Sequence, residues 1–85
     1  MSALEVSKMS LGQLVEEKLL HYLRLNETDL KGANIHQYVI EEVEKTLLRL
    51  VLEKTKGNQM KAADILGINR NTLRKKMRLY KILVK

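Results

Sequence analysis

The chain has 85 residues, 45% of them hydrophobic and 31% charged, which is typical of one folded domain. The absence of cysteine excludes a disulfide framework and a thiolate metal site. No apolar run reaches the ~18 residues of a membrane span and no signal-peptide pattern opens the chain, so we expect a cytoplasmic protein. The net charge of +6 is uneven, because residues 1–55 sum to −2 and residues 56–85 to +8. A basic block of this kind suggests a polyanionic partner.

The first predicted helix covers residues 11–25. Residues 1–10 show no clear period and are expected to be a flexible start. Ser10 and Gln13 have the spacing of a capping box, in which each side chain bonds the other residue's backbone N–H. After them, apolar residues recur at intervals of three and four, which predicts one apolar face.

The second predicted helix, residues 35–55, follows Asn34 as its N-cap. Its stretch from Leu47 to Leu52 is apolar nearly all round, with Arg49 as the one polar residue. Such a helix must be buried on more than one side, and a second subunit is the simplest cover. We therefore expect residues 11–55 to form a homodimer core, with an interface that includes Leu14, Tyr22, Val39, Val43, Leu47 and Leu50.

Two shorter helices are predicted beyond this core. Gly57 suits the left-handed C′ position that ends the long helix, and Asn58 suits the N-cap of a helix over 59–66. Asn69 then caps a final helix over 70–81. The chain is thus predicted to be a single all-α domain, residues 1–85, with four helices, in which residues 58–81 form a helix-turn-helix.

The helix-turn-helix prediction depends on residue size and spacing. Ala62 and Ala63 are small enough for two helices to cross, and Gly67 tolerates the φ > 0 that the turn needs. At about 100° per residue, Leu73, Met77 and Tyr80 share one stripe of the last helix. The adjacent stripe is cationic and carries Arg70, Arg74, Arg78 and Lys81. A helix with such a face fits the major groove of duplex DNA.

A specific resemblance supports this interpretation. The stretch GNQMKAADILGINRNTLRKK, residues 57–76, resembles the DNA-binding end of the Fis family, which includes the C-terminal domain of NtrC-type activators that work with sigma-54 RNA polymerase. Residues 42–48 resemble that family's second helix. The resemblance implies four helices, of which the first two form an intertwined dimer, and recognition helices set so closely that the DNA bends.

Carried over by position, the resemblance also implies the residues that contact DNA. Arg70 and Arg74 are the candidates for base edges, since arginine pairs bidentately with guanine. Asn58, Lys61, Thr72 and Lys76 are better placed for phosphates, which position a protein but carry little sequence information. The full predicted set is Asn58, Lys61, Asn69, Arg70, Asn71, Thr72, Arg74, Lys75, Lys76 and Arg78.

Departures from the family pattern separate two kinds of parent protein. Met60 stands where family members often have Thr, and Thr46 stands where Fis often has Pro. Only about nine residues precede the first predicted helix, whereas Fis has a longer N-terminal arm. We therefore favour the C-terminal module of an NtrC-type activator over a free-standing, nucleoid-associated Fis-like factor.

A different class of function remains as an alternative, namely a basic amphipathic module that binds proteins or a membrane surface. It leaves Gly67 and the alanine pair unexplained. No nucleophile or phosphate-cradling motif is present, so we predict no enzyme activity and no cofactor. His21 and His36 are expected to be surface or interface residues and not metal ligands, and Glu41, Glu42 and Glu44 are expected to form a solvated face.

Overall fold

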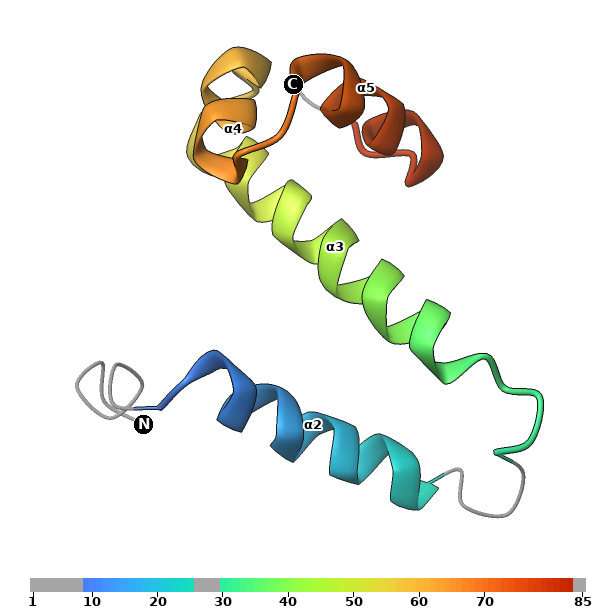
Figure 1. The fold of residues 1–85 in the computed structure, drawn as a ribbon. Coiled ribbons are helices and arrows are strands. Elements are labelled where there is room, and N and C mark those ends of the chain that lie inside the picture. Colours follow the sequence, from blue (N-terminus) through green and yellow to red (C-terminus); the bar gives the residue numbers. More distant parts are fainter. Residues whose placement is uncertain (1–8, 26–29, 84–85) are drawn as a thin grey trace. The chain divides into compact units, whose positions relative to one another are not determined.

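The computed structural model describes residues 9–25 and 30–83. Within those ranges every regular element is a helix, and no strand occurs (Figure 1). The elements are α2 (Leu11–Leu25), α3 (Ile35–Lys54), α4 (Gln59–Leu66) and α5 (Arg70–Leu79). The predicted all-α fold is confirmed, with four helices among the described residues. Residues 1–8 of the predicted flexible start lie outside the described residues.

The chain divides into two compact units, one ending at Ile35 and the other beginning at His36. The first unit contains α2, whose start is set by the predicted capping box. The Ser10 backbone N–H donates to Oε1 of Gln13 at 2.7 Å, and the Gln13 N–H donates to Oγ of Ser10 at 3.1 Å. These reciprocal bonds satisfy two of the backbone donors that a helix leaves unpaired at its start.

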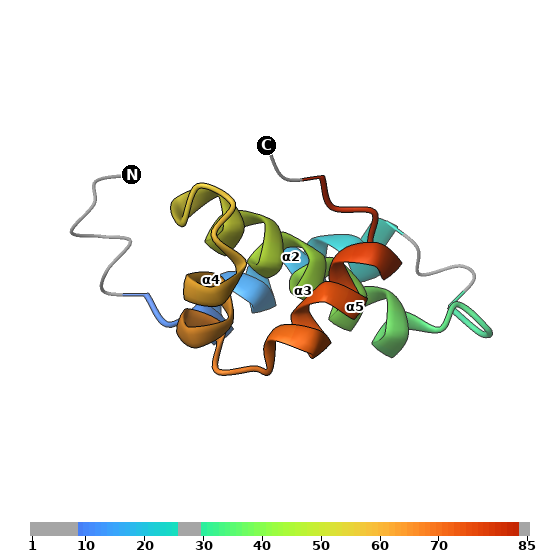
Figure 2. The same cartoon turned by 90° about the horizontal axis from the view of Figure 1, so that it is seen from above.

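The core of the second unit joins the C-terminal half of α3 to α4 and α5 (Figures 1 and 2). Each of the three helices supplies two buried side chains, which are Leu48 and Leu52, Ala62 and Ala63, and Leu73 and Met77. The alanines allow α4 to approach closely, while each buried leucine stabilises the fold by about 1.5–3 kcal/mol. This packing confirms the helix-turn-helix arrangement, in which α5 lies on a support formed by α3 and α4.

The ends of α3, α4 and α5 share one hydrogen-bonding pattern, the Schellman motif. After α4, Gly67 has a φ of 72° and the Ile68 N–H donates to the Ala63 carbonyl at 3.1 Å. A Cβ on Gly67 would meet no atom within 4 Å, so the backbone conformation, and not crowding, favours glycine there. The sharp turn between the two helices follows directly from this motif (Figure 2).

Lysine occupies the left-handed C′ position at the other two ends. Lys56 has a φ of 55° and is followed by Gly57, whose N–H donates to the Leu52 carbonyl at 2.9 Å. Lys56 is therefore the C′ residue and Gly57 the C″ residue, so the predicted placement of Gly57 at C′ is wrong by one residue. Lys81 has a φ of 53°, and the Ile82 N–H donates to the Met77 carbonyl at 2.9 Å. This left-handed residue explains why α5 ends at Leu79 and not at residue 81 as predicted.

The predicted N-cap of α3 is also wrong. An N-cap residue normally has an extended backbone, whereas Asn34 has a φ of 51°. The side chain of Gln37 donates to Oε1 of Glu41 at 3.0 Å, one helical turn further along α3. The first turn of α3 thus follows a left-handed residue and not an extended N-cap residue.

The strained conformation of Lys56 leads to a prediction about stability. A non-glycine residue in the left-handed region costs about 1–2 kcal/mol, whereas glycine adopts it freely but loses more entropy on folding. We expect Lys56→Gly to raise the free energy of unfolding by about 0.5–1 kcal/mol, measured by urea denaturation. Lys45→Gly, in the interior of α3, should lower it by about 1 kcal/mol. A Lys56→Gly protein as unstable as Lys45→Gly would contradict this account of the helix end.

Candidate nucleic-acid interface

Two asparagines fix the starts of the helices on either side of the turn. Asn58 has φ −75° and ψ 100°, and its Oδ1 accepts the Lys61 N–H at 3.1 Å. Asn69 has φ −69° and ψ 143°, and its Oδ1 accepts the Asn71 N–H at 2.7 Å. Both N-cap predictions are confirmed. Capping uses the side-chain oxygen of each asparagine. The side-chain NH₂ group of each can therefore donate a hydrogen bond to a phosphate oxygen.

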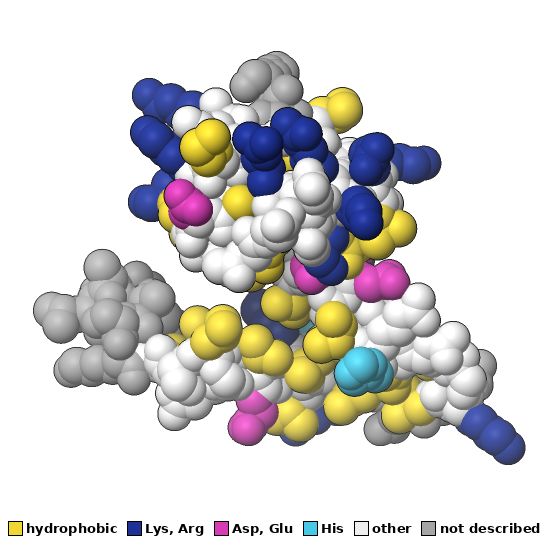
Figure 3. Space-filling view, turned by 45° about the horizontal axis from the view of Figure 1, so that its top comes forward, with side chains coloured by type: hydrophobic (Ala, Val, Ile, Leu, Met, Phe, Trp, Pro, Cys, Tyr) yellow, Lys and Arg dark blue, Asp and Glu magenta, His cyan; other side chains and the backbone are white. Residues whose placement is uncertain are grey.

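The outer face of α5 is cationic and exposed, while its inner face is apolar and buried. Leu73 is fully buried, and Met77 lies one turn further along the same inner face. On the outer face the exposed polar residues are Arg70, Asn71, Thr72, Arg74, Lys75 and Arg78. Figure 3 shows Lys and Arg side chains gathered over the part of the second unit that α4 and α5 form. The two faces therefore divide α5 into a side that packs and a side that can meet a polyanion.

One contact joins this face to the first helix of the motif. The Arg74 Nε–H donates to Oε1 of Gln59 at 3.2 Å, across the turn that separates α4 from α5. Gln59 is the first residue of α4, so this bond restrains the arginine beside the start of that helix. A guanidinium has five N–H donors and can pair with a base or a phosphate through the others.

Most of the predicted DNA-contacting residues therefore lie on one exposed surface, on α5 or at the start of α4. Asn58, Lys61 and Asn69 are exposed at the helix starts, where backbone N–H groups favour an anion. Asp64 is the one acidic residue among residues 56–85, and it too is exposed, on α4. The surface is thus strongly positive around the helix that is predicted to read DNA.

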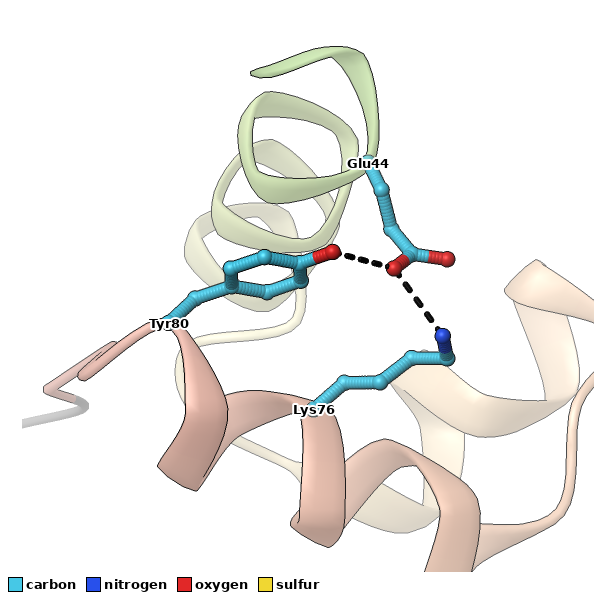
Figure 4. Close-up of polar contacts among 3 residues, drawn as sticks. All are labelled: Glu44, Lys76 and Tyr80. Carbon is cyan, nitrogen blue, oxygen red and sulfur yellow. Dashed lines mark hydrogen bonds and ion pairs between the residues drawn. The ribbon is translucent and has the colours of Figure 1, made fainter. Parts of the chain in front are cut away.

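Lys76 differs from the other predicted contacts because it forms an ion pair with an acidic side chain of the protein. Its Nζ donates to Oε1 of Glu44 at 2.9 Å, and the Tyr80 hydroxyl donates to the same oxygen at 2.6 Å (Figure 4). Glu44 comes from α3, whereas Lys76 and Tyr80 come from the C-terminal part of α5. The prediction that Glu44 belongs to a solvated face is wrong, since it is partly buried in this cluster.

The two hydrogen bonds shift the acid–base equilibria of the cluster. The bond from Tyr80, reinforced by Lys76, lowers the pKa of the Glu44 carboxyl below its ordinary value. The same bond, together with partial burial, raises the pKa of Tyr80 to about 12, since ionising the phenol would place two negative charges side by side. At neutral pH the cluster therefore holds an ionised carboxylate and a neutral phenol.

Sequence reasoning missed this cluster for a physical reason. Lys76 and Tyr80 lie 32 and 36 residues from Glu44, so only the packing of α5 on α3 brings the three together. One signal was present in the sequence, since Lys76 and Tyr80 are four residues apart and share a helix face. That signal does not identify which acidic residue of α3 they meet.

Other kinds of site find no support among the described residues. Over residues 9–25 and 30–83, no three His, Asp or Glu side chains are grouped in a way that could hold a metal ion. His21 and His36 are both exposed. None of the described helices combines the length and the apolar character needed to cross a bilayer.

Comparison with known proteins supports the interpretation of these helices. Residues 39–80 match the family described as "Bacterial regulatory protein, Fis family", and these residues include most of α3 and all of α4 and α5. The chain is 43% identical over 74 residues to the DNA-binding protein Fis of Buchnera aphidicola subsp. Acyrthosiphon pisum (strain APS), an alignment that covers 86% of this chain and 74% of the relative.

A second group of relatives consists of proteins that are much longer than this chain. The chain is 42% identical over 77 residues to the DNA-binding transcriptional regulator NtrC of Rhizobium meliloti (strain 1021), covering 91% of this chain but 16% of the relative. For the NtrC of Azospirillum brasilense the identity is 44% over 68 residues, covering 80% of this chain and 14% of the relative. The chain thus spans less than a fifth of these NtrC proteins.

Proposed function

The chain belongs to the Fis family and is a helix-turn-helix DNA-binding domain of a transcription regulator; on this premise we propose that it acts as a homodimer that reads duplex DNA through α5. The observation that carries the proposal is the exposed cationic face of α5, held on a buried apolar face. In a helix-turn-helix the second helix enters the major groove, with its N-terminal residues at the base edges. Arg70 and Arg74 then read bases, while Asn58, Lys61, Thr72 and Arg78 contact phosphates.

The proposed dimer is supported by an apolar stripe of exposed side chains on α3. Ile40, Val43, Leu47 and Leu50 recur at helical spacing and are each about half exposed, between 47% and 53%. Contiguous apolar surface of this kind on a small protein marks an interaction site. Leu14, Tyr22 and Val39 are partly buried in the single chain and complete the proposed interface. A two-fold axis would pair each copy's stripe with its equivalent.

We propose the NtrC-type activator, working with sigma-54 RNA polymerase, as the parent protein. The proposal is supported by the NtrC relatives and by Thr46 in the middle of α3, where Fis proteins often carry proline. The length of the native reading frame tests it. A frame several times longer than 85 residues supports the NtrC type, whereas a frame only slightly longer would show a free-standing Fis-like factor.

The direct test of DNA binding compares two polyanions at one salt concentration. A gel shift with duplex DNA should show a complex, while co-sedimentation with vesicles of anionic phospholipid should leave the chain in solution. Binding to the vesicles without any shift of the duplex would contradict the proposed function and favour a membrane-surface module. The comparison is decisive because both ligands attract a chain of net charge +6 electrostatically.

We also propose that the dimer bends its DNA. Lys56, Lys61, Arg78 and Lys81 are exposed outside the proposed base-reading positions, where flanking phosphates could reach them. Lys85, a further cation near the end of the sequence, lies outside the described residues. Bending a 20–30 bp site by 40–90° costs about 1–6 kcal/mol, so flexible steps between the half-sites should raise affinity without being touched. A circular-permutation gel with the central steps varied checks this. Straight DNA, with affinity indifferent to the centre, would contradict it.

A further inference from the structure

The Glu44, Lys76 and Tyr80 cluster connects the proposed dimer helix directly to the helix that reads DNA. Two donors, spaced one turn apart on α5, converge on the single oxygen Oε1 of Glu44 on α3 (Figure 4). This arrangement differs from the rest of the α3–α5 contact, which is apolar and built around Leu48, Leu52, Leu73 and Met77. Apolar burial is non-directional, whereas hydrogen bonds to a charged group fix an orientation.

The consequence concerns the rotation of α5 about its own axis. Two bonds from successive turns to one fixed atom restrain both the rotation of α5 and its position along α3. Arg70 and Arg74 lie on the same ten-residue helix, so they turn with it. Functional side chains must be held within about 0.5 Å and 10–20° of their productive geometry. A carboxylate that fixes the helix therefore also fixes where the arginines meet the bases.

The cluster also determines how many positive charges the surface offers. The Lys76 and Glu44 side chains are only 32% and 30% exposed, so their ion pair is partly shielded from water. The pKa of Glu44 lies below its ordinary value because of the bonds from Tyr80 and Lys76, so the carboxylate stays ionised at neutral pH. The positive charge of Lys76 is consequently balanced by the Glu44 carboxylate within the protein, whereas Arg78, further along α5, is exposed.

We propose that Glu44 is a positioning residue for DNA recognition, which orients α5 through Tyr80 and Lys76 and withholds Lys76 from phosphate contact. This inference rests on the proposed function and adds to it a residue outside the DNA-contacting surface. Its two effects are separable. Correct orientation strengthens binding to the preferred site, whereas withholding one cation weakens binding to all duplexes about equally, because a phosphate contact carries little sequence information.

The first test uses Lys76→Met, which keeps the length of the side chain but removes its charge. If Glu44 withholds Lys76, the salt dependence of binding to a scrambled duplex should match that of the wild type. If Lys76 contacts phosphate, the slope of log affinity against log salt should fall by about one per protomer. The second result would overturn the proposal, and Arg78→Ala provides the matched variant for which that decrease is expected.

The second test uses Glu44→Gln, with Glu41→Gln as its control. Both variants remove one negative charge from α3, but Glu41 is exposed and bonded to Gln37. We expect Glu44→Gln to bind the scrambled duplex more tightly, with a slope steeper by about one per protomer. The ratio of affinities for the preferred site and the scrambled duplex should fall about tenfold, which is the decrease expected when a hydrogen bond to a charged group is lost. Glu41→Gln should change neither quantity.

A purely structural role for Glu44 predicts a different pattern. Simple destabilisation lowers affinity for both duplexes alike and leaves the slope unchanged, and that outcome would overturn the proposal. Tyr80→Phe separates the two effects because it loses only the hydroxyl bond, so site preference should fall while the slope stays constant. Ultraviolet titration provides a check independent of DNA, since in Glu44→Gln the pKa of Tyr80 should fall from about 12 toward its ordinary value.

Failure of the proposed function is distinguishable from failure of this inference. A wild-type chain that binds neither duplex would contradict the proposed function and the positioning role with it. A wild-type chain that prefers its site, while Glu44→Gln shows the same preference and the same slope, would overturn the role of Glu44 alone.

Discussion

Replacing Leu47 by Asp is expected to break the dimer and to lower affinity for the preferred duplex by about 10²–10⁴-fold, the contribution of linking two binding modules. Leu47 is 49% exposed in the single chain, so an aspartate there is tolerated by the monomer's own core. In an isologous interface the substitution appears twice, and burying an unpaired charge is costly. Sedimentation velocity and duplex titration on the same protein measure both effects.

The control for this substitution is Ile65→Asp. Ile65 is also an exposed aliphatic residue, at 58%, but it lies on α4 and outside the apolar stripe of α3. Ile65→Asp should therefore remain as dimeric as the wild type. A Leu47→Asp protein that still sediments as a dimer would show that the α3 stripe is not the interface.

The second large effect is expected for Arg74→Ala. Arg74 lies in the middle of the exposed face of α5, and a bidentate arginine–guanine pair contributes about 1–3 kcal/mol of discrimination. The variant should lose about that much binding free energy on the preferred site and discriminate less among sites. Competition binding against duplexes that differ at single positions measures both quantities.

Arg78→Ala is the matched control, one helical turn further along the same face. As a phosphate contact it should weaken all duplexes about equally and reduce the salt slope by about one per protomer. If Arg74→Ala and Arg78→Ala behave identically across the set of duplexes, the division of α5 into base-reading and phosphate-contacting residues is wrong.

The sequence was most informative where structure depends on near neighbours. The Ser10–Gln13 capping box and the caps Asn58 and Asn69 each involve residues two or three positions apart, so a local pattern specifies them. The helix-turn-helix followed from residue size, because a small pair and a left-handed glycine restrict how two helices can cross. Errors of one or two residues arose at the helix ends, where Lys56 and Lys81 adopt a conformation usually left to glycine.

The sequence was sufficient to predict which residues share the exposed face of α5, but not which of them pair with other side chains of the protein. Helical spacing alone places Arg70, Arg74 and Arg78 on one side of α5 and Leu73 on the other. The pairing of Lys76 with Glu44 depends on how α5 packs on α3, which no local pattern encodes. A list of cations therefore overstates the charge that this surface offers to DNA.

We propose that two copies of this chain read one two-fold site through α5. This can be checked by selection of duplexes from a random pool, followed by sedimentation of the complex with the selected duplex. We expect the selected sequences to share an imperfect palindrome with arginine-readable guanines, and the complex to contain two chains per duplex. A pool that stays random after selection, or a complex with one chain per duplex, would contradict it.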